Sequence, residues 1–267
     1  MTLAPRPVIA LLTDFGLRDH YVAAMKGVML GICPDATFLD VTHEITPQDV
    51  LEGALELEAV ARYLPPGTVV VGVVDPGVGS LRRGIAIEAG GLRFVGPDNG
   101  LFSLAVGPRT PDLAVEITNG AFMRDSISRT FEGRDRFAPV AAWLARGAHV
   151  SECGPVASDL VALTVPRAVV TPERIDGVVL REDRFGNLMT NIRRDDLSVV
   201  GLQASVRVAD TTITALSATY ADVAHGALCA LVGSTDRLEI ATNGGSATAI
   251  LGVARGAAVH VLRRSGA

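Results

Sequence analysis

A continuous apolar run at residues 69–74, VVVGVV, constrains the fold more than any other stretch of the chain. Such a run is typical of a strand buried on both faces, as in a parallel sheet that helices cover on each side. The run stops at Asp75, and a turn rich in Pro and Gly separates Asp75 from Arg82. Ligands of open α/β sheets bind beyond the carboxyl ends of strands, so Asp75 is a candidate site residue. A strand-end turn with one salt bridge explains the same residues, and the pattern leaves both interpretations open.

A second carboxylate follows an apolar stretch in the same way. Residues 8–12 predict a strand that ends at Thr13-Asp14, residues 21–32 have helical spacing, and residues 38–41 predict the next strand of a βαβ unit. We therefore expect a Rossmann-like N-terminal α/β domain with a mostly parallel sheet, in which both carboxylates face one crevice. A G-x-G-x-x-G fingerprint is absent, which argues against a dinucleotide-binding site.

Besides a short helix at residues 101–106, two further helices are expected in this domain. One begins with Thr46 as its N-cap and Pro47 in the first helical position, and continues to about Tyr63. The other is an apolar helix at residues 137–145, which follows a dense polar block at residues 128–135. Polar side chains and free amides at a helix start suit an anionic or polar ligand, and helix capping with local ion pairs explains them as well.

The sequence pattern changes beyond a Pro-punctuated stretch at residues 155–172. We place a boundary in it, which gives an N-terminal α/β domain at residues 1–168 and a C-terminal β domain at residues 169–267. Short alternating segments predict that the smaller C-terminal domain is antiparallel and β-barrel-like. The expected strands are residues 177–180, 205–208, 211–213, 227–232, 238–241 and 258–262.

The composition excludes several classes of partner. With 24 Lys and Arg against 29 Asp and Glu the net charge is -5, and no basic stripe suited to nucleic acid is present. The N-terminal apolar segment is too short for a signal peptide or a membrane span, so we expect a cytoplasmic protein that contacts neither nucleic acid nor membrane. The 5 histidines and 3 cysteines show no metal-ligand spacing, so we expect no metal site.

Eight short blocks stand in order along nearly the whole chain: TDFG, YVAAMKG, ICPDA, VTHEITPQDV, VDPGVGSxRR, GPDNGL, TFEGRDRFAP and DRFGNLMTNI. Together they resemble the S-adenosyl-L-methionine hydroxide adenosyltransferase family, whose relatives are the fluorinases and chlorinases. Any one block is a weak signal, but the ordered series is specific.

The resemblance implies hydrolysis of S-adenosyl-L-methionine to adenosine and L-methionine, by displacement at the ribose C5′ with the sulfonium as leaving group. It also implies a homotrimer whose sites lie between the N-domain of one subunit and the C-domain of its neighbour. S-adenosyl-L-methionine is then the substrate, and no cofactor is expected. The alternatives are a halide-dependent adenosyltransferase of the chlorinase type, and a catalytically impaired protein that binds S-adenosyl-L-methionine or adenosine.

The resemblance also implies a set of substrate-binding residues. Asp14 would hold the ribose hydroxyls. Phe185 and Asn187 would contact the substrate from the neighbouring subunit. Asp183, Ser234 and the backbone at residues 242–244 would complete the methionine and adenine pockets. The full expected set is Asp14, Asn99, Phe131, Asp183, Phe185, Asn187, Tyr220, Ser234, Asn243 and Gly244.

The hydrolases of this family are marked by an Asp, an Arg and a His around the nucleophilic water. Asp75 and Arg82 match the first two, but the family sequence TFHGRD is TFEGRD here, so Glu132 stands in the place of the histidine. A sulfonium leaves without protonation, so the site must present an aimed, desolvated oxygen nucleophile and needs no general acid. Arg82 would stabilise hydroxide character, and Asp75 would orient the water. Glu132 is then a base, a salt-bridge partner of Arg82, or a substitution that impairs catalysis.

Overall fold

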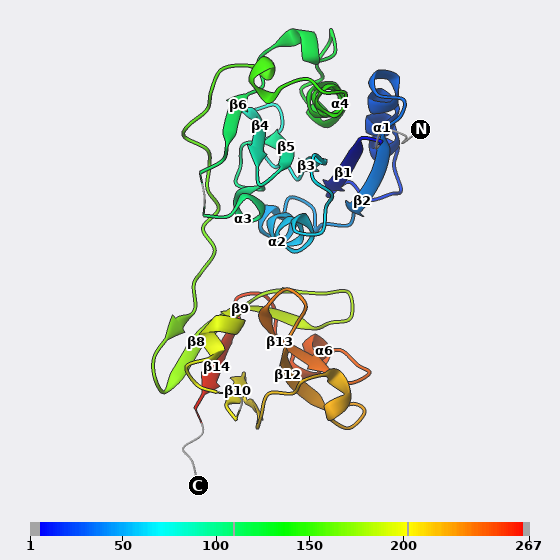
Figure 1. The fold of residues 1–267 in the computed structure, drawn as a ribbon. Coiled ribbons are helices and arrows are strands. Elements are labelled where there is room, and N and C mark those ends of the chain that lie inside the picture. Colours follow the sequence, from blue (N-terminus) through cyan, green and yellow to red (C-terminus); the bar gives the residue numbers. More distant parts are fainter. Residues whose placement is uncertain (1–5, 109, 202, 264–267) are drawn as a thin grey trace, which may run out of the picture. The chain divides into compact units, whose positions relative to one another are not determined.

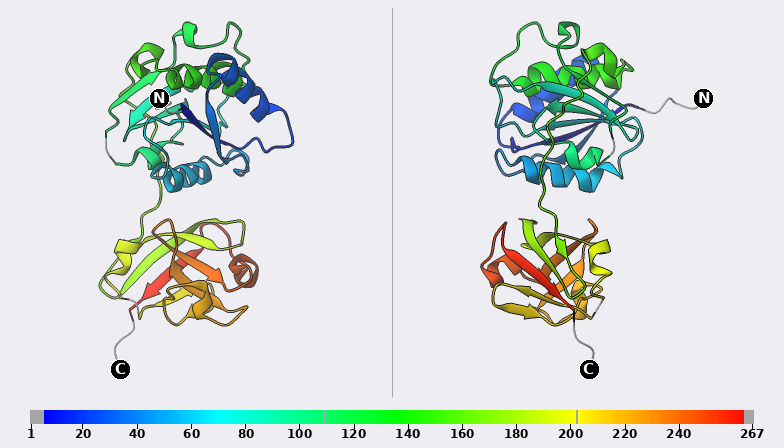
Figure 2. Two further views of the ribbon diagram at one scale, coloured as in Figure 1. Left: turned by 45° about the vertical axis from the view of Figure 1, so that its right-hand side comes forward. Right: turned by 90° about the vertical axis from the view of Figure 1, so that its left-hand side faces the viewer.

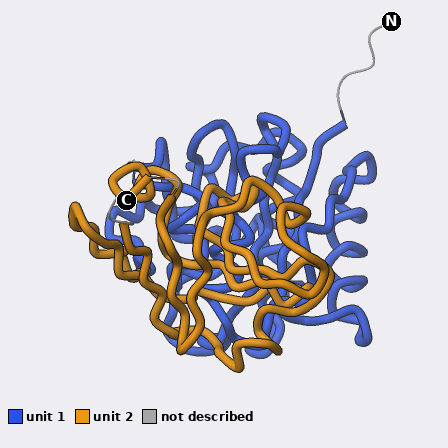
Figure 3. Tube along the Cα trace, turned by 90° about the horizontal axis from the view of Figure 1, so that it is seen from below, with its two compact units in different colours: residues 1–163 blue, residues 164–267 orange. Residues whose placement is uncertain are grey.

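The computed structural model describes residues 6–108, 110–201 and 203–263. The chain forms two compact units, Met1–Leu163 and Thr164–Ala267 (Figures 1 and 3). The division falls inside the Pro-punctuated stretch at residues 155–172. The N-terminal unit has one sheet with a hydrophobic core on each face, and the C-terminal unit has its own sheet and core.

The N-terminal unit contains six strands: β1 (Val8–Thr13), β2 (Thr37–Thr42), β3 (Val69–Val73), β4 (Gly84–Ala89), β5 (Leu92–Pro97) and β6 (Leu113–Glu116). They form one sheet in the order β2-β1-β3-β5-β4-β6. The first four strands of this order are parallel, and β4 runs antiparallel to β5 and β6. The mostly parallel sheet expected from the sequence is confirmed.

Helices cover both faces of this sheet (Figures 1 and 2). One face carries α1 (Tyr21–Ile32) and α4 (Ala138–Ala145), and the other carries α2 (Val50–Ala61) and the short α3 (Ser103–Val106). Three single turns complete the unit: η1 (Gly120–Phe122), the π-helical η2 (Gly133–Phe137) and η3 (Val150–Cys153). None of the helices in the described part of the chain is both long and apolar enough to cross a membrane.

The residues of β3 and its flank alternate between two cores. Val69, Val71 and Val73 pack in the cluster on the side of α1 and α4. Val70 and Val74 pack in the cluster on the side of α2 and α3. Every residue of β3 is buried, which confirms the prediction of a strand covered on both faces.

The C-terminal unit is an antiparallel, nearly closed barrel. Its strands are β7 (Val169–Val170), β8 (Arg174–Glu182), β9 (Leu188–Arg193), β10 (Ser205–Val208), β11 (Thr211–Ile213), β12 (Leu228–Val232), β13 (Arg237–Thr242) and β14 (Ala258–Leu262). Three short helical segments are α5 (Arg194–Leu197), η4 (Tyr220–Asp222) and α6 (Ala247–Leu251). The strand order is β11-β10-β14-β8-β9-β13-β12, with β7 beside β8, and a bridge from Leu216 to Ala230 brings the two ends of the order together.

Strand β9 was absent from the expected set because polar residues interrupt its apolar pattern. Two of them, Thr190 and Asn191, are buried. Thr190 Oγ1 donates to the carbonyl of Leu238 at 2.8 Å, and Asn191 Oδ1 accepts from the amide of Val178 at 2.8 Å. These side chains serve the backbone of neighbouring strands, so burial here does not require apolar residues.

Candidate active site

Asp75 follows the buried end of β3, at the carboxyl edge of the parallel sheet. The loop after β5 is tied to this point by Asn99, whose Nδ2 donates to the carbonyl of Val74 at 2.8 Å. The Oδ1 atom of Asn99 accepts from the amide of Leu101 at 3.2 Å. The side chain of Asn99 therefore fixes the two neighbouring strand ends beside Asp75.

Arg82 joins the two candidate catalytic carboxylates. Its Nε donates to Oδ1 of Asp75 at 2.9 Å, its Nη2 also bonds Oδ2 of Asp75, and its Nη1 donates to Oε2 of Glu132 at 2.9 Å. The three side chains are nearly buried, with exposed fractions of 5%, 10% and 8% for Asp75, Arg82 and Glu132. Although burial alone would lower the pKa of Arg82, its interactions with Asp75 and Glu132 raise it above the ordinary value. Arg82 is thus held as a permanent cation between two acids.

Asp14 lies on the same edge of the sheet. It directly follows β1, which is the parallel neighbour of β3. Burial raises the pKa of Asp14, and the negative charge of Asp75 raises it further, as expected for two carboxylates facing one region. The predicted convergence of Asp14 and Asp75 is therefore seen in the structure.

The expected helix start at Thr46 is wrong. The turn found there instead provides a hydrogen bond to Asp14. Helix α2 begins at Val50 with Asp49 as N-cap, because Gln48 adopts a left-handed conformation with φ of 66°. This turn directs the amide of Gln48 to Oδ2 of Asp14 at 2.8 Å. A non-glycine residue in this conformation is strained, which is common beside functional sites.

A chain of hydrogen bonds, buried at Thr13 and His43 and partly exposed at Asp40 and Lys26, supports the turn that carries Asp14, and the sequence analysis did not single it out. Thr13 Oγ1 accepts from the amide of Phe15 at 3.3 Å and pairs with Nδ1 of His43 at 2.8 Å. His43 Nε2 pairs with Asp40 at 3.0 Å, and Asp40 binds Lys26 at 2.7 Å. The chain of hydrogen bonds spans three elements, and no local motif in the sequence announces it.

The polar block at residues 128–135 is organised largely by its own ion pairs. Asp135 is fully buried and accepts two bonds of 2.7 Å from Arg134 and one of 2.9 Å from the amide of Ser128. Arg124 pairs with the same carboxylate at 3.2 Å. Burial alone would raise the pKa of Asp135, but Arg134 and the amide of Ser128 hold it below the ordinary value. Within this block, Glu132 is the acid whose carboxylate binds Arg82.

Phe131 is anchored in the core at the edge of the site. Its ring meets Tyr21 edge-on with centroids 5.0 Å apart and lies 6.1 Å from the ring of Phe15. Only 8% of Phe131 is exposed. The sequence analysis singled out neither Tyr21 nor Phe15, because their contact with Phe131 depends on the fold.

The C-terminal unit presents a second group of expected residues. Asp183 organises the turn between β8 and β9: its Oδ1 accepts from the amides of Phe185 and Asn187, each at 2.9 Å, and its Oδ2 accepts from Nδ2 of Asn187 at 2.9 Å. The turn leaves Phe185 75% exposed, whereas Asn187 is buried. An aromatic side chain is thereby displayed on a rigid turn.

Tyr220 joins this group through a residue that the sequence analysis missed. Its hydroxyl donates to Oε1 of Glu239 at 2.7 Å. Burial raises the pKa of both groups: the bond to Glu239 adds to the effect on Tyr220, and the charge of Asp183 adds to that on Glu239. Asp183, Tyr220 and Glu239 therefore form one electrostatic cluster.

The remaining expected residues lie in turns of the barrel. Ser234 is exposed between β12 and β13. Asn243 follows β13 and donates from Nδ2 to the carbonyl of Val223 at 2.8 Å. Gly244 has a φ of 76°, and a Cβ atom there would lie 2.5 Å from Nε2 of His225. The expected substrate-binding residues are thus divided between the two units.

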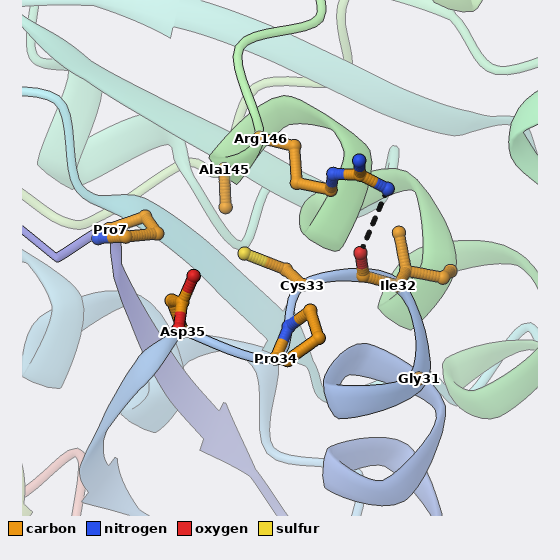
Figure 4. A pocket seen from close by; sticks show the side chains of 8 residues that line it. All are labelled: Pro7, Gly31, Ile32, Cys33, Pro34, Asp35, Ala145 and Arg146. Atoms are coloured by element: carbon orange, nitrogen blue, oxygen red, sulfur yellow. Dashed lines mark hydrogen bonds between the residues drawn. The ribbon is translucent and has the colours of Figure 1, made fainter.

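No group of three or more His, Cys, Asp and Glu side chains suited to a metal ion occurs among residues 6–108, 110–201 and 203–263. A surface hollow at the end of α1 is lined by Pro7, Cys33, Asp35 and Arg146, where Arg146 Nη1 donates to the carbonyl of Ile32 at 3.1 Å (Figure 4). Pro7 precedes β1, whereas Asp14 follows it, so this hollow lies at the opposite edge of the sheet from the candidate site.

Comparison with known families gives a match in each of the two units. The model of the SAM hydroxide adenosyltransferase N-terminal domain matches residues 9–154, and that of the C-terminal domain matches residues 177–260. The chain belongs to the SAM hydroxide adenosyltransferase family. The family resemblance seen in the short sequence blocks is confirmed.

Individual relatives span nearly the whole chain. The chain is 41% identical to an (R)-S-adenosyl-L-methionine hydrolase of Salinispora tropica, over 97% of this chain and 99% of that protein. It is 38% identical to an (R)-S-adenosyl-L-methionine hydrolase of Thermus thermophilus, over 96% of this chain and 100% of that protein. A fluorinase of Actinopolyspora mzabensis is more distant: it is 31% identical, over 97% of this chain and 98% of that protein.

A solved structure shares the same fold. An uncharacterized conserved protein from Thermotoga maritima superposes with a TM-score of 0.90 at 35% identity, and the match covers 96% of this chain and all of that one. The two-unit architecture is thus common to this SAM hydroxide adenosyltransferase chain and a relative of known structure.

Proposed function

We propose that the protein hydrolyses (R)-S-adenosyl-L-methionine to adenosine and L-methionine. The observation that carries the proposal is the buried Asp75–Arg82–Glu132 network at the carboxyl edge of the sheet. The names of the similar proteins from Salinispora tropica and Thermus thermophilus support the substrate and the reaction.

The network suits the chemistry of the reaction. The oxygen of water attacks the ribose C5′, the bond from C5′ to sulfur breaks with its electrons passing to sulfur, and water loses a proton. Arg82 stabilises the hydroxide character of the nucleophile, and Asp75 orients it. Oε2 of Glu132 is the oxygen that meets both Arg82, at 2.9 Å, and Arg136, at 3.3 Å. Oε1 of Glu132 is therefore the proposed acceptor of the water's proton.

The two groups of residues divide the binding of substrate. Asp14 holds the ribose hydroxyls, with Asn99 and Phe131 around it. The barrel group, headed by Phe185 and Asn187, binds the adenosyl and methionine parts from a neighbouring subunit. The protein acts in this proposal as a homotrimer in the cytoplasm, with no cofactor.

The test is an endpoint assay with product identification. Purified protein is incubated with S-adenosyl-L-methionine in chloride-containing buffer, and the products are separated by chromatography. Adenosine and L-methionine in equal amounts are expected. The absence of adenosine above a control without enzyme would reject hydrolysis, and calorimetric binding of substrate without product would then identify a non-catalytic binding protein.

Halide transfer is a second candidate because the fluorinase of Actinopolyspora mzabensis is a relative. The carboxylates of Asp75 and Glu132 oppose a halide ion in the position of the water. Halogenated adenosine in place of adenosine in the same chromatogram would establish this activity.

A further inference from the structure

Arg136 contacts the proposed catalytic network from one side. Its Nη1 forms an ion pair with Oε2 of Glu132 at 3.3 Å, four residues along the same helical segment. Its Nε atom is buried and has no hydrogen-bond partner among the described residues. Buried polar atoms in folded proteins are normally satisfied, so a guanidinium that keeps an unpaired atom requires an explanation.

The packing brings Arg136 and Arg82 to the same oxygen. Gly84, the first residue of β4, leaves the space for Arg136: a Cβ atom there would lie 3.0 Å from Cδ of Arg136 and 2.8 Å from a ring carbon of Phe137. Phe137 also faces the guanidinium of Arg82 at 5.3 Å from its ring centroid. Both guanidinium groups then meet Oε2 of Glu132, at 2.9 Å from Arg82 and 3.3 Å from Arg136.

The charges of this cluster balance only when Arg136 is counted. Asp75 and Glu132 supply two negative charges, and Arg82 and Arg136 supply two positive charges. With Arg82 alone, the excess negative charge would oppose hydroxide character on an attacking water. With both arginines on Oε2, Oε1 of Glu132 is left as the available acceptor.

We infer that Arg136 is a positioning residue, which balances the charge of Glu132 and fixes its Oε2 so that Oε1 receives the proton of the attacking water. This inference rests on the proposed hydrolysis at the same site. Arg136 acts on Glu132 and not on the substrate, so its removal should change kcat more than KM.

The test is a double-mutant cycle in the adenosine-release assay. Arg136→Met is expected to lower kcat by about 10-fold to 100-fold, with KM changed by less than about threefold. In the Glu132→Gln background the same substitution should cost less than about threefold, because no carboxylate remains to be balanced. Arg136→Lys, which keeps the charge, should recover at least about threefold in kcat over Arg136→Met.

The matched control is Arg146→Met, which removes an arginine bonded to the carbonyl of Ile32 at the opposite edge of the sheet. It should leave kcat unchanged. Equal losses for Arg136→Met in the two backgrounds, or retention of kcat within about threefold in the single variant, would overturn the inference. Failure of the lysine variant to recover kcat would overturn the charge-balancing role.

Urea unfolding separates this inference from the proposed function. It is measured on the four proteins of the cycle: wild type, Arg136→Met, Glu132→Gln and the double variant. Arg136→Met should lower the unfolding midpoint in the wild-type background and much less in the Glu132→Gln background. If wild-type protein releases no adenosine, the proposed function fails, and the unfolding cycle still decides whether Arg136 holds Glu132. Additive shifts of the midpoint would then show that it does not.

Discussion

The two arginine contacts of Glu132 fall on one oxygen of its carboxylate. Arg82 and Arg136 both meet Oε2, and the residue is nearly buried. A carboxylate that served only to neutralise Arg82 would commonly bind it through both oxygens, as Asp75 does. The one-sided binding of Glu132 thus favours a role toward a third group, which in the proposed reaction is water.

Glu132→Gln tests this role directly. Glutamine keeps the size and an oxygen that can bind Arg82, but it cannot accept a proton at neutral pH. We expect kcat to fall by about 100-fold and KM to change little, as for loss of a general base. Measured rates of adenosine release decide, with the exposed Glu173→Gln as control. An unchanged kcat would leave Glu132 a structural role only.

Asp14→Asn should make the protein more stable at pH 7 and weaken its binding of substrate. Because burial and Asp75 raise the pKa of Asp14 above 3.8, the stability this group contributes is full below pH 3.8 and is lost as pH rises through the folded-state pKa. The variant should therefore melt a few degrees above wild type at pH 7, and the gap should narrow toward pH 4. KM should rise about tenfold or more, since the proposed bond to the ribose loses its charge. Asp35→Asn, an exposed change, should alter neither quantity.

Elements position these residues through contacts that no single element contains. The segment from residue 124 to residue 137 is held in its folded form because Asp135 binds Arg134, Arg124 and the amide of Ser128 within it. The π-helical turn η2 then sets Glu132 and Arg136 on the same side. Loss of the Asp135 anchor should loosen the whole segment.

Asp135→Asn is expected to destabilise the protein by about 2 kcal/mol at pH 7, because the amide of Ser128 and the partly exposed guanidinium groups of Arg134 and Arg124 lose their charged acceptor. The folded-state pKa of Asp135 is lowered, so its contribution is present above the ordinary value of 3.8 and is lost as pH falls through the folded-state pKa. The difference from wild type in urea unfolding should shrink in acid. The exposed Asp112→Asn should not differ from wild type, and an equally large loss in that control would refute the anchor.

The sequence predicts elements well where one rule decides them. The apolar run of β3 and the carboxylate after it are such a case, since burial on both faces admits little else. Strand β9 was not predicted because Thr190 and Asn191, although polar, are buried with their hydrogen bonds satisfied by neighbouring strands. The start of α2 was misplaced because the left-handed conformation of Gln48 depends on its contact with Asp14, a residue distant in sequence.

The candidate site shows the same limit. Asp14 and Asp75 could be expected together because parallel strands place their carboxyl ends at one edge. Glu239 and Arg136 could not be predicted as site residues, because each matters through a partner that is not apparent from the sequence. Glu239 binds the hydroxyl of Tyr220, and Arg136 meets the oxygen of Glu132 that Arg82 already binds. A charged residue in a sequence does not disclose which oxygen of its partner it will bind.

At the scale of the whole molecule, each unit carries its own part of the expected substrate-binding set. The exposed Phe185 stands on a rigid turn of the barrel, and Asp75 lies at the edge of the sheet. In the proposed trimer each active site would combine these parts from two neighbouring subunits. Inactive variants of different units should then complement one another.

Asp75→Asn and Phe185→Ala provide that test. Each variant alone should lose most activity, but trimers reassembled from an equal mixture should regain about a quarter of wild-type activity, because one site in four pairs two intact parts. The measurement is adenosine release after joint unfolding and refolding, with each variant refolded alone as reference. No recovery in mixed trimers, confirmed as trimers by sedimentation, would contradict shared sites.

The two cores of the N-terminal unit have a consequence for engineering. Phe131 and Phe137, which flank Glu132, belong to the cluster of α1 and α4, whereas the cluster of α2 and α3 contains neither. Repacking on the first side would disturb the acid that the proposed reaction depends on. A thermostable catalyst should therefore be sought by substitutions in the part of the second core that lies away from Val74, the neighbour of Asp75, where volume can be changed without moving the 131–137 segment.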